Sequence, residues 1–79
     1  MNQGQASVAM GERLRKVRQQ RQLSQETLAR RAMLALSTII RIERGQRSAH
    51  PETIQRLASA LDISPQWLMR GDDNDRQEV

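Results

Sequence analysis

Several residue types are absent or nearly absent from this 79-residue chain. It contains no cysteine, phenylalanine or tyrosine, and only one tryptophan (Trp67), one histidine (His50) and one lysine (Lys16). Without cysteine the chain can form neither a disulfide nor a cysteine-ligated metal site, and one histidine does not make a metal site by itself. We therefore expect no metal and no cofactor. The scarcity of aromatic residues disfavours a β-sheet.

Long apolar runs are missing as well. No apolar stretch approaches the ~20 residues that a membrane-spanning helix needs. The first residues, MNQGQAS, have neither the basic nor the apolar region of a signal peptide. A chain of this length makes one domain at most, and such a domain buries only roughly 60% of its unfolded surface. We expect a small protein that acts in the cytoplasm, does not bind membranes and shows no evident small-molecule ligand.

The charge is distributed unevenly along the chain. Twelve of the thirteen basic residues are arginine, and the last eight residues (72–79) hold four acids and one arginine. Residues 1–71 therefore carry twelve basic and five acidic side chains, a net charge of +7, against +4 for the whole chain. Such a basic body indicates a polyanionic partner, or else a solvated arginine-rich surface. Arginine suits phosphate because its planar fork bonds two oxygens at once.

Apolar residues recur at helical spacing, and capping residues divide the chain into five helices. The expected helices run from Ser7 to about Gln20, from Ser24 to about Ala32, from about Leu36 to Arg44, from Pro51 through Leu61, and from Ser64-Pro65 to Gly71. The sequence predicts three parts: a flexible N-terminus (1–6), a helical domain (7–71) and an acidic, disordered tail (72–79). The fold class is therefore all-α and compact, because each short helix needs the others to bury its apolar face.

Four blocks of sequence carry a family likeness. They are LSQETLA at 23–29, STIIRIERG at 37–45, ETIQRLASAL at 52–61 and SPQWLMRG at 64–71. In this order and at this spacing they resemble the lambda-repressor-like (XRE, or Cro-cI type) helix-turn-helix DNA-binding domain, close to the N-terminal domains of phage repressors. The resemblance implies a five-helix domain that places its third helix in the major groove of double-stranded DNA.

The resemblance also implies DNA-binding roles for individual residues. Gln25 would meet the DNA backbone through its N–H, since a helix N-terminus attracts phosphate. In the third helix, the positions facing the groove are Leu36, Ser37 and Arg41, with Ala35, Thr38 and Ile40 nearby. Arg41 is the one side chain among them suited to bidentate pairing with guanine. Arg44 and Arg47 follow at positions where the family contacts the DNA backbone.

Two further sets of residues acquire structural roles from the resemblance. Arg18 and Glu43 match a pair that forms a buried ion bridge between the first and third helices, although both residues could instead be surface charges. Pro65, Gln66 and Trp67 lie where a homodimer interface is expected. Trp67 is equally well explained as a core residue, or as both.

The sequence departs from the family pattern around the turn. Met33 replaces the usual glycine, Ala35 replaces a serine or threonine cap, Leu36 replaces a polar base reader, and Ala49 stands where proline is common. Because residues 33–36 favour a helix, the alternative that residues 25–44 form one long helix stays open. Leu36 and Ile40 also have two interpretations: they touch thymine methyl groups, or they form a patch that binds another protein.

These observations favour a sequence-specific DNA-binding transcriptional regulator, a repressor that binds a two-fold-related operator as a homodimer. It would act in the cytoplasm on the nucleoid, encoded by a bacterium or a phage. The alternative is an antitoxin-like or adaptor module that uses the same fold to bind proteins. No glycine-rich phosphate loop or nucleophile motif occurs in the sequence, so we expect no enzyme activity and no catalytic residues.

Overall fold

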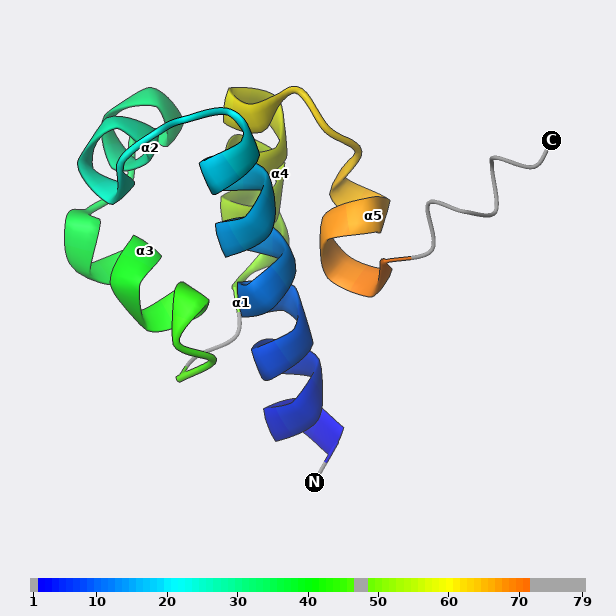
Figure 1. The fold of residues 1–79 in the computed structure, drawn as a ribbon. Helices are drawn as coiled ribbons and strands as arrows, with labels where there is room; N and C mark the ends of the chain where they lie inside the picture. The colour runs from blue at the N-terminus through cyan, green and yellow to red at the C-terminus, as the bar shows by residue number, and fades with distance from the viewer. Residues whose placement is uncertain (1, 47–48, 72–79) are drawn as a thin grey trace, which may run out of the picture.

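The computed structural model describes residues 2–46 and 49–71, with the backbone alone for residues 2–6 (Figure 1). The described residues form α-helices and no strand, which confirms the all-α prediction. The helices are α1 (Asn2–Gln20), α2 (Gln25–Ala32), α3 (Leu36–Glu43), α4 (Pro51–Leu61) and α5 (Pro65–Arg70). Arg47 and the acidic tail at 72–79 lie outside the described residues.

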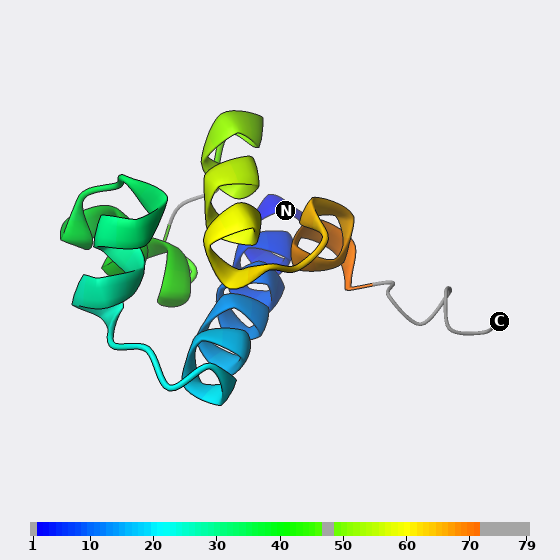
Figure 2. The same ribbon diagram turned by 90° about the horizontal axis from the view of Figure 1, so that it is seen from above.

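The helices pack as a closed ring around one core. Helix α1 contacts α3 on one side and α5 on the other, α2 packs on both α3 and α4, and α4 packs on α5 (Figure 1). Seen from above, α2 and α3 lie together at one side of the molecule and α5 lies at the other (Figure 2). The helix-turn-helix unit therefore occupies one side of the molecule, while the last helix packs on the other side of α1.

The core draws on every helix. Its largest fully buried side chains are Leu14, Leu28, Ile39, Ile42, Leu57, Leu61 and Leu68. The apolar side chains of Met10, Leu14 and Val17, spaced at i, i+4 and i+7 along α1, are all buried. Isolated helices as short as α2, α3 and α5 are marginal in water. Their stability therefore comes from this shared core.

The beginning of α1 differs from the prediction. The helix starts at Asn2 and Ser7 lies inside it, buried rather than capping its N-terminus. Residues 2–6, expected to form a flexible N-terminus, are the first residues of the helix. The reason is that glutamine and alanine in this segment are good helix formers, so nothing requires the helix to stop at a potential cap.

The turn after α2 excludes one long helix across residues 25–44. Met33 adopts the left-handed conformation (φ 60°, ψ 46°), and Ala35 is extended. The Met33 N–H donates to the Arg30 carbonyl (3.1 Å), and the Leu34 N–H donates to the Ala29 carbonyl (2.9 Å). These two bonds make a Schellman motif, which satisfies the last carbonyls of a helix. The long-helix alternative is therefore wrong.

The same pair of hydrogen bonds ends three other helices. Left-handed residues stand at Gln22 after α1, at Gly45 after α3 and at Asp62 after α4. In each case their N–H and the next residue's N–H reach back to carbonyls of the final turn. Among the four residues that end a helix with this pair of bonds, Met33 included, only Gly45 is a glycine; Gly71, which is also left-handed, follows α5. The others carry the cost of this conformation for an L-residue, roughly 1–2 kcal/mol each.

Helices α1 and α3 approach closely at Gly11. A Cβ atom on Gly11 would overlap the Ile42 carbonyl oxygen and would lie 3.0 Å from the Glu43 carbonyl oxygen. Both atoms belong to the backbone at the end of α3, so neither can turn aside as a side chain would. The absence of a side chain at Gly11 thus sets how deeply α3 is seated against α1.

Candidate nucleic-acid interface

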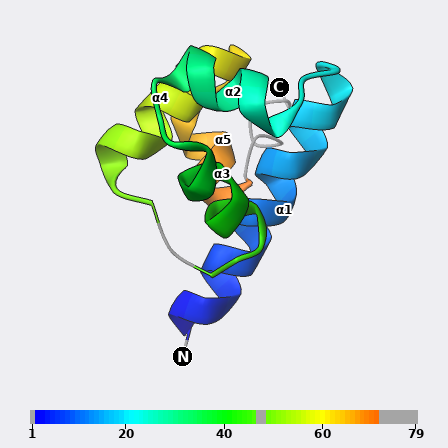
Figure 3. The same cartoon turned by 90° about the vertical axis from the view of Figure 1, so that its left-hand side faces the viewer.

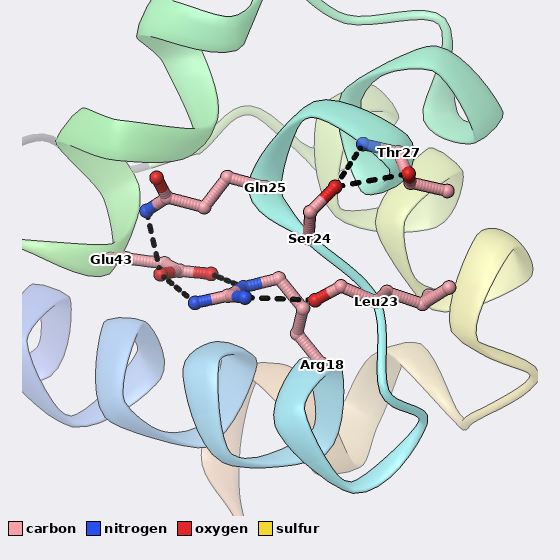
Figure 4. A network of polar contacts seen from close by, with 6 residues as sticks. All are labelled: Arg18, Leu23, Ser24, Gln25, Thr27 and Glu43. Atoms are coloured by element: carbon pink, nitrogen blue, oxygen red, sulfur yellow. Dashed lines mark hydrogen bonds and ion pairs between the residues drawn. The ribbon is translucent and has the colours of Figure 1, made fainter.

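The N-terminus of α2 is fixed by a local cap. Ser24 is extended, and its Oγ accepts a hydrogen bond from the Thr27 N–H at 3.0 Å (Figure 4). The Ser24 hydroxyl also bonds Oγ1 of Thr27 at 3.0 Å. Serine is preferred at this position because its oxygen satisfies an N–H that has no partner within the helix. The cap predicted at Ser24 is confirmed, and Gln25 is the first residue of α2.

A buried polar network ties three helices together behind this cap. Arg18 on α1 donates from Nε to Glu43 Oε2 (2.6 Å) and from Nη2 to Glu43 Oε1 (3.0 Å). Gln25 donates from Nε2 to the same Oε1 at 3.0 Å. Figure 4 shows the guanidinium and the amide converging on the one carboxylate. The Arg18–Glu43 ion pair expected from the sequence is present, with side chains only 12% and 4% exposed.

The network also holds the chain just before α2. The third guanidinium nitrogen of Arg18, Nη1, donates to the Leu23 carbonyl at 2.9 Å. Because Gln25 donates to the buried carboxylate of Glu43, its side chain points into the protein. Its backbone N–H lies in the first turn of α2, where N–H groups lack partners within the helix. Such groups can meet a DNA phosphate.

One face of α3 is exposed, and we call it the reading face. Its residues are Leu36, Ser37, Arg41 and Arg44, which are all exposed. Thr38 and Ile40 are half-buried at its edge, while Ile39, Ile42 and Glu43 point inward. In Figure 3 this helix lies in front of the rest of the molecule, below α2.

The reading face carries positive charge that no described residue neutralises. Within the described part of the chain, the guanidinium groups of Arg41 and Arg44 form no ion pair and no hydrogen bond. At the start of the helix, Ala35 provides no side-chain cap, as its replacement of serine or threonine predicts. The face thus offers two arginines, one hydroxyl and one apolar side chain to a ligand.

Four arginines bind groups of the protein itself instead of being free to bind a ligand. Only Arg18 was expected to do so; the sequence did not predict this role for Arg13, Arg21 and Arg56. Arg13 donates to the Leu68 carbonyl (2.9 Å) and to the Met69 carbonyl at the end of α5. Arg21 donates to the Leu61 carbonyl at the end of α4 (3.1 Å). Basic side chains favour helix C-termini for this reason. The bonds span 40 residues or more, so no local signal in the sequence identifies them.

Arg56 is the third arginine of this kind. Its Nη1 donates to the Met33 carbonyl at 3.3 Å, and its Nη2 pairs with Glu52 at 3.0 Å. With Arg18, these side chains account for a third of the basic residues between positions 1 and 71. The total positive charge therefore overstates what is available to a polyanion.

Helix α5 presents the residues expected at a dimer interface. Ser64 caps the helix, its Oγ accepting from the Trp67 N–H at 3.2 Å. Pro65 and Trp67 are half-buried, and Gln66 is exposed. Trp67 packs against the core and also lines a shallow groove of about 380 Å³ beside α1. Trp67 is therefore partly a core residue and partly a surface residue, and its exposed part is the one that could meet a second copy of the chain.

The same described residues contain neither a membrane-spanning helix nor a candidate metal site. None of the helices there has the length and apolar character needed to cross a membrane. No three histidine, cysteine or acidic side chains in that part of the chain gather where they could hold a metal ion.

A family model for helix-turn-helix domains, HTH_3, matches residues 14–68. That span runs from α1 to α5 and includes the capped α2, the left-handed turn and α3. The chain belongs to this helix-turn-helix family. The family comprises DNA-binding transcription regulators of the XRE type, in agreement with the resemblance seen in the four sequence blocks.

Two solved structures are similar to the helix-turn-helix chain. One is the restriction-modification controller protein C.AhdI from Aeromonas hydrophila, with 47% identity and a TM-score of 0.76; the match covers 78% of this chain and 94% of that one. The other is an HTH_3 family transcriptional regulator from Vibrio cholerae, with 24% identity and a TM-score of 0.82, covering 91% of this chain and 40% of that one. The second likeness is one of fold alone. No curated protein matches this sequence.

Proposed function

We propose that this protein is a sequence-specific transcriptional regulator, a repressor, that binds a two-fold-related operator as a homodimer. The observation that carries the proposal is the reading face of α3. It is exposed and positively charged, and the buried Arg18–Glu43–Gln25 network braces it from behind. A helix-turn-helix protein needs this combination, because base readout requires a rigid helix in the major groove.

Each contact residue has a proposed task. Arg41 reads a guanine edge through its two parallel N–H groups. Ser37 and Thr38 accept or donate hydrogen bonds at neighbouring base edges or phosphates. Gln25, through its backbone N–H, and Arg44 hold the phosphate backbone and so fix the register of α3. Arg47 has the same proposed task, although it lies outside the described residues.

The similarity to C.AhdI supports a more specific role. That protein is a controller of a restriction-modification system, and the match covers nearly all of it. We therefore propose that this chain controls genes of such a system in the bacterial cytoplasm, where it is bound to the nucleoid. The protein is then a binding protein rather than an enzyme, in keeping with a family of DNA-binding regulators.

The homodimer would form around Pro65, Gln66 and Trp67 on α5. In a two-fold interface the same patch meets itself, so a charge placed there meets its own copy. Gln66→Arg is expected to weaken dimerisation, measured by sedimentation velocity over a range of concentrations. Gln55→Arg, at an exposed position of α4, is the matched control. Equal dissociation constants for the two variants would remove α5 from the interface.

The second candidate function is a protein-binding module, which the exposed apolar side chains favour. Met33 is 76% exposed and Leu36 is 37% exposed. An interaction module would bind duplex DNA weakly, and its binding would depend little on salt. A DNA-binding regulator that neutralises several phosphates should show a steep, linear fall of log K with log salt concentration.

Selection of bound fragments from random duplex DNA tests the proposal directly. A regulator of this kind should yield a two-fold-related consensus whose half-sites are about one helical turn apart, roughly 34 Å. The dimer model fails if the consensus has a single half-site. If no duplex is enriched at low salt, DNA is not the ligand and the protein-binding module is the better explanation.

A further inference from the structure

The first residue of α3, Leu36, is apolar where a helix entering DNA meets base edges. Leu36 is the first residue of the helix and keeps 37% of its surface exposed, although Leu14, Leu28 and Leu57 in the core are fully buried. Ala35 before it is also exposed. Half-buried Ile40 lies one turn further along the same side of the helix. The start of the reading face therefore offers an apolar side chain, next to the Ser37 hydroxyl, to whatever it meets.

The major groove contains one apolar group, the C5-methyl of a pyrimidine. The other groups that distinguish the bases there are hydrogen-bond donors or acceptors, and the remaining ring C–H edges, such as C5–H of cytosine, present less apolar surface than a methyl group. A leucine placed against the donors or acceptors would strip their water and return no hydrogen bond, which costs free energy. A leucine placed against a methyl group gains from contact between two apolar surfaces. The chemistry of Leu36 thus suits one kind of groove atom.

We propose that Leu36, with Ile40 beside it, is a specificity-determining contact for a pyrimidine C5-methyl group, in thymine or in 5-methylcytosine. The inference rests on the proposed function, because it assigns a ligand group within the DNA site. The charge of the face suits a polyanion such as DNA. Arg41 and Arg44 share the face with Leu36, and the nearest acid on α3, Glu43, is buried and already paired.

Met33 is more exposed than Leu36 but does not belong to this contact. It lines a separate groove together with Glu52, Gln55 and Arg56 of α4. Its carbonyl accepts a hydrogen bond from Arg56. The apolar contact is therefore assigned to α3 alone.

Helix geometry limits the candidates for the methyl group. Leu36 and Arg41 are five residues apart, which corresponds to a rise of about 7.5 Å along the helix. Base pairs rise by 3.4 Å. The pyrimidines within about three base pairs of the guanine recognised by Arg41 are therefore the candidates, and the one at which Leu36→Ala changes the base preference is the position assigned to Leu36.

The test uses the full chain and the operator obtained by selection. At the position assigned to Leu36, four duplexes are compared by competition binding: thymine against uracil, and 5-methylcytosine against cytosine. Each pair differs only in the C5-methyl group. Burying one methyl group corresponds to about 0.8 kcal/mol, which is a roughly three- to five-fold gain in affinity. The wild-type protein should show this gain in both pairs.

Two variants separate a contact made by Leu36 from an effect of the methyl group on DNA shape. Leu36→Ala should lose the methyl preference, because the coupling between side chain and methyl group is gone. Val8→Ala removes part of another exposed apolar side chain, on α1, and should keep it. Leu36→Ala is expected to fold, since the side chain lies outside the core and alanine favours helices.

The possible results separate this inference from the proposed function. If the operator is selected but Leu36→Ala keeps the full methyl preference, the inference is wrong and DNA binding stands. The same conclusion follows if wild-type protein binds thymine and uracil duplexes equally. If no operator is selected at all, the proposed function fails, and the inference fails with it.

Discussion

Nε of Arg18 in α1 lies 2.6 Å from Oε2 of Glu43 at the end of α3, and both side chains are largely buried. The pair joins the longest helix of the domain to the helix proposed to read DNA. The other partners of the two charges, the Leu23 carbonyl and the Gln25 amide, are neutral. Removal of either charge therefore leaves the other without an ionic partner inside the protein.

Glu43→Ala should therefore destabilise the domain strongly. Breaking a buried ion pair from one side costs about 3–5 kcal/mol, a large part of the ~5–15 kcal/mol that stabilises a typical domain. The change would be measured by urea denaturation. Glu52→Ala is the matched control, because it breaks the exposed Glu52–Arg56 pair and should cost less than about 1 kcal/mol. Equal losses would contradict a special role for the buried pair.

Gly11→Ala should also destabilise the protein, against the usual trend. In an exposed helix interior this change stabilises by about 1 kcal/mol. At Gly11 the new Cβ would overlap the Ile42 carbonyl, so α1 and α3 must move apart. We expect a lower denaturation midpoint and weaker DNA binding together. An increase in stability would show that the two helices can separate without cost.

Met33→Gly should stabilise the protein by about 0.5–1 kcal/mol. The left-handed conformation at Met33 is free of steric cost for glycine, although glycine also gives up more conformational entropy on folding. Thermal unfolding would measure the gain. The reverse change, Gly45→Ala, should destabilise, since residue 45 has a φ of 73° and a Cβ there would lie 2.8 Å from Val8. An unchanged melting temperature for Met33→Gly would mean that the turn is unstrained.

Arg41→Ala should lower affinity for the selected operator by about 1–3 kcal/mol and relax the preference at one base pair. The arginine is exposed, so its removal should leave the unfolding midpoint unchanged. Competition binding against single-base operator variants would measure both effects. If neither affinity nor preference changes, Arg41 does not contact a base.

Arg44→Ala should weaken binding to all duplexes by the same factor. A phosphate contact carries no sequence information, and its loss reduces the slope of log K against log salt concentration by about 0.9. Arg47→Ala is expected to behave in the same way. Titrations of operator and random duplex at several salt concentrations would test this. A change confined to the operator would instead make Arg44 a base reader.

Features fixed by local chemistry were predictable from the sequence. Ser24 and Ser64 cap their helices, and Pro51 opens α4, because each residue type satisfies or avoids the free N–H groups at a helix start. Ser7 was misleading for the same reason: it is a cap type, but α1 begins five residues before it. The all-α fold needed only these signals and the apolar spacing.

Features fixed by packing were not predictable from residue types alone. The bonds from Arg13 and Arg21 to the ends of distant helices depend on how α1 lies against α5 and α4. The left-handed residues Gln22 and Asp62 lack the glycine that usually marks a helix end. The Arg18–Glu43 pair was expected only through resemblance to a family. The contacts with DNA remain predictions.

Two separate sets of residues support α3 and form its reading face. Arg18, Gln25 and Glu43 hold the helix from inside, while Leu36, Ser37 and Arg41 point away from that network. Substitutions on the outer side can therefore accumulate without disturbing the support. A lineage of such proteins can diverge in operator preference while its fold stays constant, and libraries that randomise positions 36, 37 and 41 should remain mostly folded.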